Sequence, residues 1–212
     1  MQELINIIDC YNKTAKNYAD KFLHELDKKH LDRILLKAFA NENMDKGKCI
    51  DLGCGPGQTT KYLFDCRLTG ITGTDISPEM MEVAKSIHPM LHFERADMLQ
   101  LQYADNSFGS AIAFYAIVHF DEEQLKIALT EIKRILSPGG QFLFSFHIGT
   151  DMVHHDQFLD HEVDIDFYFF ETKKIIDLLK ETGFKLIDII EREPYPGIEY
   201  ASKRAYIWVK KE

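Results

Sequence analysis

The segment Cys49–Thr60, CIDLGCGPGQTT, restricts the fold of this chain more than any other part of the sequence. A short apolar run ends at the acidic residue Asp51, and Gly53, Gly55 and Gly57 follow at alternate positions. Glycine adopts backbone angles that other residues avoid, and it lets a ligand approach the main chain. In an open α/β sheet, ligands bind at the carboxyl ends of the strands. The segment therefore predicts a strand that ends in a ligand-binding turn.

Strand-like and helix-like segments alternate along the chain after this turn. Helices are expected at 58–64, 77–87, 121–136 and 171–181. Seven strands are expected, at 48–53, 68–76, 91–97, within 108–120, and at 141–147, 185–191 and 204–209. This alternation predicts the α/β class, with a doubly wound, mostly parallel seven-stranded sheet and helices on both faces. No helix separates the last two strands, so the C-terminal strand should be antiparallel.

The length of the chain fits a single domain over residues 1–212. Residues 1–43 carry helical periodicity, and we expect them to form an N-terminal helical cap. Residues 148–170 are acidic and aromatic, and we expect a loop-like insertion that covers the substrate. This insertion contains three histidines without a standard metal-binding spacing, so no metal site is expected.

The composition argues against several classes of protein. A net charge of −9 disfavours a surface for nucleic acid or anionic membrane, because phosphate binding depends on clustered Lys and Arg. No apolar run approaches the roughly 20 residues that span a bilayer, and the first residues lack the pattern of a secretory signal. The four cysteines form no CxxC pair. We therefore expect a reduced, cytoplasmic protein that binds no nucleic acid and no membrane, as a monomer or homodimer.

The spacing of the glycines indicates the charge of the ligand. The pattern is GxGxG, interrupted by a proline, whereas dinucleotide sites have GxGxxG. A carboxylate at Asp51 would repel a pyrophosphate and would suit a positive group. Asp75 ends the second expected strand, where a carboxylate can accept hydrogen bonds from a ribose diol. With Asp97 at the end of the third strand, the acids indicate a cationic adenosine ligand.

At these positions the chain resembles the class I S-adenosylmethionine-dependent methyltransferases, especially those that act on small molecules. The resemblance extends from about Cys49 to Phe146 through the motifs DLGCGPG, GTDIS, RADM, FYAIVHF and LSPGGQFLFSF. It implies a Rossmann-like methyltransferase fold and the cofactor S-adenosyl-L-methionine, with S-adenosyl-L-homocysteine as product.

The resemblance also implies a role for each motif. Asp51 and the glycine turn would hold the amino-acid end of the cofactor, Asp75 would bind the ribose, and Ile76 would lie against the adenine. Asp97 and Met98 would contact the adenine edge. The implied cofactor-binding set is Tyr18, Asp51, Gly53, Cys54, Gly55, Gly57, Asp75, Ile76, Met80, Asp97, Met98, Phe114, Tyr115 and Ala116. Simpler roles stay open: Asp51 as a turn cap, Asp75 and Asp97 as ordinary acids near loops, and Cys54 as a small filler.

The acceptor is not specified by these motifs. The resemblance implies in-line transfer of a methyl group to a small molecule, and His119, which follows the fourth strand, is the candidate base. His119 could equally be a packing residue before the helix that begins near Asp121. Tyr195, Glu199 and Tyr200 are expected to rim the cleft. Two other functions stay open: a non-catalytic module that binds the adenosyl cofactor, and an NAD-dependent oxidoreductase.

Overall fold

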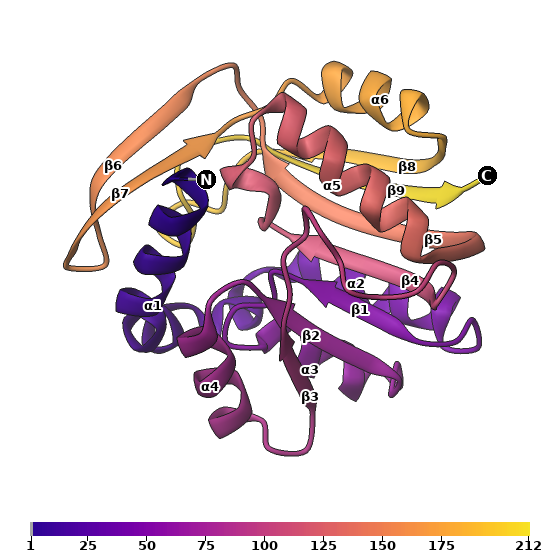
Figure 1. Ribbon diagram of the computed structural model, residues 1–212, viewed down its shortest axis with the longest axis horizontal. Coiled ribbons are helices and arrows are strands. Elements are labelled where there is room, and N and C mark those ends of the chain that lie inside the picture. The colour runs from indigo at the N-terminus through magenta and orange to yellow at the C-terminus, as the bar shows by residue number, and fades with distance from the viewer. Residues whose placement is uncertain (1) are drawn as a thin grey trace.

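The computed structural model describes residues 2–212 and contains a seven-stranded sheet (Figure 1). Its strands are β1 (Cys49–Leu52), β2 (Ile71–Asp75), β3 (His92–Arg95), β4 (Phe108–Phe114), β5 (Leu136–His147), β8 (Phe184–Arg192) and β9 (Arg204–Lys211). The spatial order is β3-β2-β1-β4-β5-β9-β8. Strands β1 to β5 pair in parallel, and β9 runs antiparallel between β5 and β8. The predicted fold class is confirmed, and the strand order reverses at β1 and β4, where α/β sheets bind ligands.

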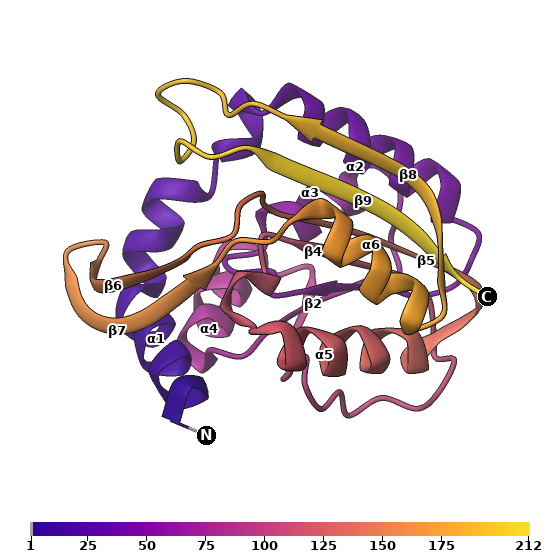
Figure 2. The same ribbon diagram turned by 90° about the horizontal axis from the view of Figure 1, so that it is seen from above.

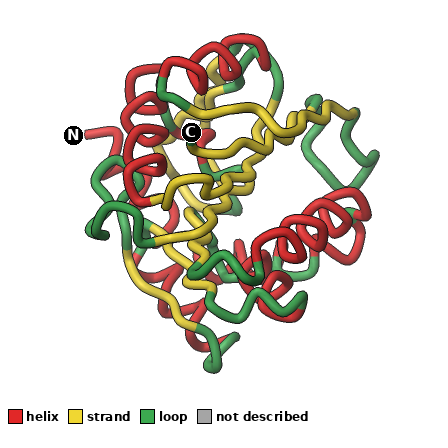
Figure 3. The backbone as a smooth tube through the Cα atoms, turned by 90° about the vertical axis from the view of Figure 1, so that its right-hand side faces the viewer, coloured by secondary structure: helices red, strands yellow, loops and turns green. Residues whose placement is uncertain are grey.

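Helices cover both faces of this sheet, as the views in Figures 2 and 3 show. They are α1 (Gln2–Phe22), η1 (Glu25–Lys28), α2 (His30–Asn43), α3 (Gln58–Asp65), α4 (Pro78–Ile87), η2 (Ile117–His119), α5 (Glu122–Ile135) and α6 (Thr172–Glu181). The predicted cap of residues 1–43 corresponds to α1, η1 and α2, and Met1 lies outside the described residues. Within residues 2–212, no helix combines the length and the apolar character needed to cross a bilayer.

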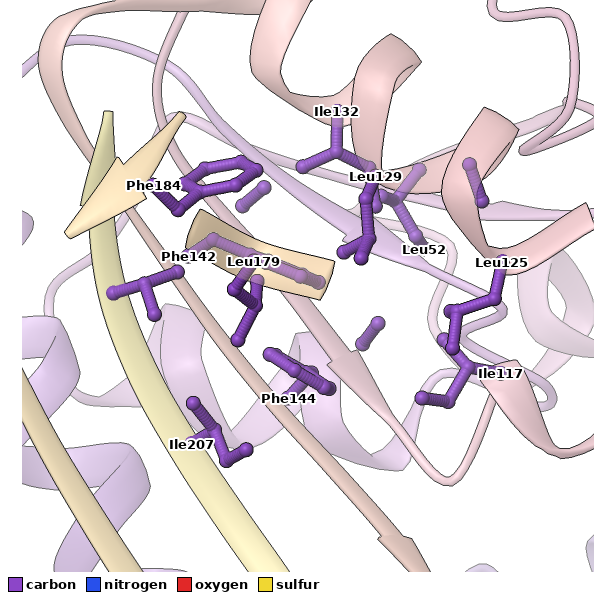
Figure 4. Packing of buried hydrophobic residues seen from close by; sticks show 14 of the residues in the cluster. Leu52, Ile117, Leu125, Leu129, Ile132, Phe142, Phe144, Leu179, Phe184 and Ile207 are labelled. Atoms are coloured by element: carbon purple, nitrogen blue, oxygen red, sulfur yellow. The ribbon is translucent and has the colours of Figure 1, made fainter. Parts of the chain in front are cut away.

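Side chains alternate between the two faces of the sheet with the two-residue period of a strand. In β5, Phe142 and Phe144 pack with residues of α5 and α6, whereas Leu143 packs with α2 and α3 on the opposite face. Figure 4 shows Leu129 of α5 and Leu179 of α6 beside the two phenylalanines. Two hydrophobic cores therefore hold the strands rigidly, and the ends of β1, β2 and β4 form a fixed platform.

Local sequence signals fix where the central helices begin. The Ser77 side chain accepts a hydrogen bond from the Met80 N–H and so caps α4. Asp121 and Gln124 form a reciprocal capping box at the start of α5. These caps place the turns between strands and helices, which lie at the carboxyl edge of the sheet.

The segment 148–170 differs from the prediction of a loop. It forms a hairpin of β6 (Met152–Phe158) and β7 (His161–Tyr168), a separate two-stranded sheet. Leu159 and Asp160 close the turn with φ of 48° and 65°. The prediction was wrong: Val163, Ile165 and Phe167 of β7 alternate with acidic residues, the two-residue pattern of a strand, whereas β6 shows no such alternation. The hairpin lies beside α1 in both ribbon views, and Asn17 of α1 donates to the Leu159 carbonyl at 3.1 Å.

Candidate functional site

Two cavities meet at the carboxyl ends of β1, β2 and β4. The larger has a volume of about 530 Å³ and the smaller about 80 Å³. All of the predicted cofactor residues except Gly57 line one or both of them. The residues that line both cavities define a junction and are Tyr11, Tyr18, Gly53, Gly55, Phe114 and Tyr115. The sequence motifs therefore converge in space as expected.

The glycine turn forms part of the junction wall, and its glycines differ in role. Gly53 has φ of 67°, and a Cβ there would overlap the Cβ of Ala116. Gly57 has φ of 87° and lies against the Phe93 ring, where an added Cβ would approach Cζ to 2.6 Å. It lines neither cavity, so it allows α3 to begin and to pack closely instead of contacting a ligand. The structure thus gives no support to Gly57 as a cofactor-binding residue.

Asp51 lies at the base of the larger cavity and is almost completely buried. Its Oδ2 accepts a hydrogen bond from the Thr60 hydroxyl at 2.6 Å. Burial, opposed by the Thr60 hydrogen bond and assisted by the charge of Asp75, raises the pKa of this carboxyl to about 7. A positive ligand beside Asp51 would favour the ionised form.

Asp75 lines the smaller cavity and is held by the backbone on two sides. Its Oδ2 accepts from the Gly55 N–H at 3.1 Å, and its Oδ1 accepts from the Ser77 N–H at 3.0 Å. Each carboxylate oxygen retains a further lone pair for a ligand. Asp97 lines the same cavity, and its Oδ1 accepts from the Leu99 N–H at 2.8 Å. Each of the two carboxylates is therefore held by backbone N–H groups and can still accept a hydrogen bond from a ligand.

His119 is buried in η2 and lines the smaller cavity. Its Nε2 lies 2.7 Å from the Tyr11 hydroxyl, and its Nδ1 lies 3.0 Å from the backbone oxygen of Asp166 in the hairpin. Burial lowers the pKa of His119 to about 4, although Asp166 acts in the opposite direction. His119 is therefore a neutral imidazole at pH 7, bonded to both α1 and the hairpin.

Aromatic rings form the outer wall of the larger cavity. Tyr18 and Phe22 of α1 lie with ring centroids 4.5 Å apart, and the Phe158 ring of the hairpin lies 6.5 Å from Tyr18. Phe167 and Phe169 also line this cavity, whereas the neighbouring Phe170 packs against the Phe146 core ring. The aromatic cluster of the insertion therefore divides between cavity wall and core.

A buried ion-pair network forms the opposite wall, and sequence inspection did not reveal it. Glu199 accepts from Arg192 at 2.7 Å and lies 3.2 Å from Arg204 and 3.7 Å from Lys29. Burial alone would raise the pKa of Glu199, but the Arg192 hydrogen bond and the nearby cations lower it to about 2. Asp32 pairs with Arg192 at 3.1 Å. Glu199 and Tyr200 line the cavity as expected. Tyr195 lines neither cavity; its hydroxyl accepts from the Leu31 N–H at 3.2 Å instead.

The hairpin histidines are separate from this network. The His154 Nδ1 atom donates to the Asp166 carboxylate at 2.9 Å on the exposed side of the hairpin. Among the described residues 2–212, no group of three or more His, Cys, Asp or Glu side chains is arranged to hold a metal ion.

The comparisons with known proteins agree with this geometry. Residues 50–144 match the family model described as a methyltransferase domain. An O-methyltransferase from Pyrenophora dematioidea is 29% identical over 155 residues, which cover 67% of this chain and 55% of that protein. The chain spans about half the length of the curated relatives it matches.

Solved structures show the same fold. Magnesium protoporphyrin IX methyltransferase from Synechocystis PCC 6803, solved with bound S-adenosylmethionine, superposes with a TM-score of 0.73 at 15% identity, covering 100% of this chain and 98% of that chain. The cyclase SpnF superposes with a TM-score of 0.64 at 19% identity, covering 84% and 81% of the two chains. The fold is shared with solved structures of S-adenosylmethionine-dependent methyltransferases, and residues 50–144 match the methyltransferase domain model. The resemblance stated from the motifs is thereby confirmed.

Proposed function

We propose that the protein is an S-adenosylmethionine-dependent methyltransferase that transfers a methyl group in line to a small molecule. The junction of the two cavities carries this proposal. The sulfur of the cofactor joins an adenosyl part to an amino-acid part, and the two cavities join in the same way at the glycine turn. The sulfonium would lie at the junction with its methyl group directed into the larger cavity.

The charges around the junction support a cationic cofactor. Asp51 faces the larger cavity, where the ammonium and sulfonium groups would lie. Asp75 and Asp97 line the smaller cavity with Ile76 and Met98, and these residues suit a ribose and an adenine. The smaller cavity has room for only a few water molecules. Helix α1 covers it, so the cofactor requires this helix to move outward when it binds.

The larger cavity supports a small, partly aromatic acceptor. It is in the size range of pockets for drug-sized ligands, and its rings offer an apolar wall. Several curated relatives are named O-methyltransferases, which favours an oxygen acceptor. Once the activated methyl group and the acceptor are aligned and water is excluded from between them, the protein has little further chemistry to supply.

A non-catalytic or non-methylating function is the second candidate, because the cyclase SpnF shares the fold and fold alone does not fix function. Isothermal titration with S-adenosylmethionine, S-adenosylhomocysteine and NAD tests the first step. We expect binding of both adenosyl ligands and none of NAD, and NAD binding without adenosyl binding would refute the proposal. Turnover of S-adenosylmethionine with a panel of phenols, carboxylates, amines and thiols then separates an enzyme from a binding module.

A further inference from the structure

His147 ends strand β5 and lies next to the junction of the two cavities. Its ring centroid is 5.3 Å from that of Tyr115, a residue that lines both cavities. His147 itself lines the larger cavity and not the smaller one. Its imidazole therefore borders the space proposed for the acceptor, beside the place proposed for the sulfonium.

The two ring nitrogens of His147 have different surroundings. The Nδ1 atom lies 2.6 Å from the Ser202 hydroxyl. Among the described residues 2–212, no backbone or side-chain group bonds the Nε2 atom, and this atom is accessible. A hydroxyl can donate or accept, so Ser202 can support the tautomer in which Nε2 carries the lone pair. One nitrogen thus holds the ring in place, and the other is available to a molecule in the cavity.

The charges around His147 keep its ring neutral. Burial, assisted by the charges of Arg204 and Lys29 and opposed by that of Glu199, lowers the pKa of His147 to about 4. At pH 7 the side chain is therefore an imidazole with a lone pair and not an imidazolium.

The contacts of His147 do not depend on helix α1. Its ring centroid lies 5.4 Å from that of Phe169, which follows the hairpin, and 6.0 Å from that of Tyr200, which precedes β9. Neither these two residues nor Ser202 belongs to α1. The imidazole therefore stays in place when α1 moves outward to admit the cofactor.

We propose that the Nε2 atom of His147 takes the proton of a phenolic hydroxyl while the oxygen of that hydroxyl accepts the methyl group. In this step the O–C bond forms, the S–C bond breaks to leave a thioether, and the hydroxyl proton moves to Nε2. The positive charge of the sulfur passes to the imidazole, which then releases the proton to solvent. A phenol oxygen that gains a methyl group becomes a much stronger acid than an imidazolium, so a weakly basic imidazole is sufficient.

This inference rests on the proposed function and narrows the acceptor to a phenol. Among oxygen acceptors, a carboxylic acid is ionised at pH 7 and needs no base, whereas a phenol with the pKa of a tyrosine, about 10, keeps its proton. Phe158, Phe167 and Phe169 line the same cavity and can pack against an aromatic acceptor. His119, the base expected from the sequence, lines only the smaller cavity, on the side of the adenosyl group.

Two phenols that differ in acidity test this role. A phenol that the panel identifies as an acceptor is compared with its nitro derivative, which is ionised in mildly alkaline buffer and needs no base. His147→Gln keeps a donor and an acceptor at this position but cannot take up a proton. Relative to wild type, kcat/KM should fall about 10²–10⁴-fold for the parent phenol and less than about fivefold for the nitro derivative.

His92→Gln is the matched control, because His92 is an exposed residue of β3 and lines neither cavity. It should change neither rate. Calorimetry with S-adenosylhomocysteine shows whether each variant is folded, since His147 does not line the smaller cavity. The ratio of the two rates within one variant is independent of the fraction that is folded.

The outcomes distinguish this inference from the proposed function. A wild-type protein that binds neither adenosyl ligand overturns both. Adenosyl binding without turnover of any phenol overturns the inference alone, and so does an equal loss with both phenols in His147→Gln. A selective loss for the parent phenol in His119→Gln, and not in His147→Gln, would identify His119 as the base and also overturn it.

Discussion

The two cavities that meet at the glycine turn are built in different ways. The smaller is formed mainly by the turns that follow β1, β2, β3 and β4, with one face of α1 across it, and backbone N–H groups hold its acid Asp75. The larger is formed by side chains from α1, the β6–β7 hairpin and the segment before β9, which are additions to the sheet. Changes in the first should act through backbone geometry. Substitutions at the larger cavity should act through pairs of side chains and should leave the strand-end turns of the smaller cavity intact.

Gly53→Ala tests the backbone-built side and should have the largest effect. A side chain at φ of 67° costs about 1–2 kcal/mol, and the overlap with Ala116 adds about 1–3 kcal/mol. We expect a loss of about 2–5 kcal/mol in the free energy of unfolding, with loss of S-adenosylhomocysteine binding, by denaturant titration and calorimetry. Gly139→Ala is the control, because it has φ of 74° and no neighbour within 4 Å. Equal losses in the two variants would show that the close approach to Ala116 has no consequence.

Asp75→Ala should weaken S-adenosylhomocysteine binding by about 1.5–3 kcal/mol, the scale of a hydrogen bond to a charged group. The Gly55 and Ser77 N–H groups lose their partner as well, so the melting temperature should fall. Asp97→Ala, which removes the acceptor of only one N–H, should show the smaller decrease in melting temperature. A folded Asp75→Ala protein with normal affinity would place the ribose elsewhere.

Asp51 should make stability depend on pH. Burial raises its folded pKa from 3.8 to about 7, so between these values the folded state binds more protons than the unfolded state. The contribution of Asp51 therefore decreases as pH rises towards 7 and is lost above it. Wild type should lose up to about 1.4 kcal/mol per pH unit relative to Asp51→Asn between pH 5 and 7. Parallel curves for the two proteins from denaturant titrations would show that Asp51 is not perturbed, although Asp75 and Thr60 lie beside it.

Phe158→Ala tests the side-chain-built side and should have the smallest effect on the cofactor. This ring contacts Tyr11, Tyr18 and Phe167 but lines only the larger cavity. We expect affinity for S-adenosylhomocysteine to change by less than about twofold, because the ring itself lines only the larger cavity and reaches the smaller one only through Tyr11 and Tyr18. The KM for an acceptor found by screening should rise. A large loss of cofactor affinity would show that the cavities are not built separately.

The same contrast explains what the sequence could predict. The glycine turn, the Ser77 cap and the acids at the strand ends lie in short segments, and each can be recognised from a few neighbouring residues. Most residues of the smaller cavity that belong to the sheet could therefore be predicted from motifs. Gly57 was the exception, because a glycine that packs against Phe93 cannot be distinguished by spacing from one that faces a ligand.

The larger cavity depends on partners far apart in the chain. Tyr11, which lines both cavities, bonds to His119 across 108 positions, and no spacing rule pairs them. The hairpin was missed although Val163, Ile165 and Phe167 of β7 alternate with acids, because β6 carries histidines and shows no matching alternation that would indicate a partner strand. The Lys29 and Glu199 ion pair was missed for the same reason as the tyrosine and histidine pair.

The buried ion-pair network also has a consequence for the order of folding. Asp32 bonds to Arg192 across 160 positions and to Tyr206 across 174 positions. Contacts of such separation form late, because loop-closure entropy opposes them until the intervening chain is ordered. During synthesis, the strands that bear the acids of the smaller cavity emerge well before Arg192 and Arg204 exist. The nascent chain should therefore acquire the strand ends of the smaller cavity first, and gain the ion-pair wall of the larger cavity only when its last strand joins the sheet.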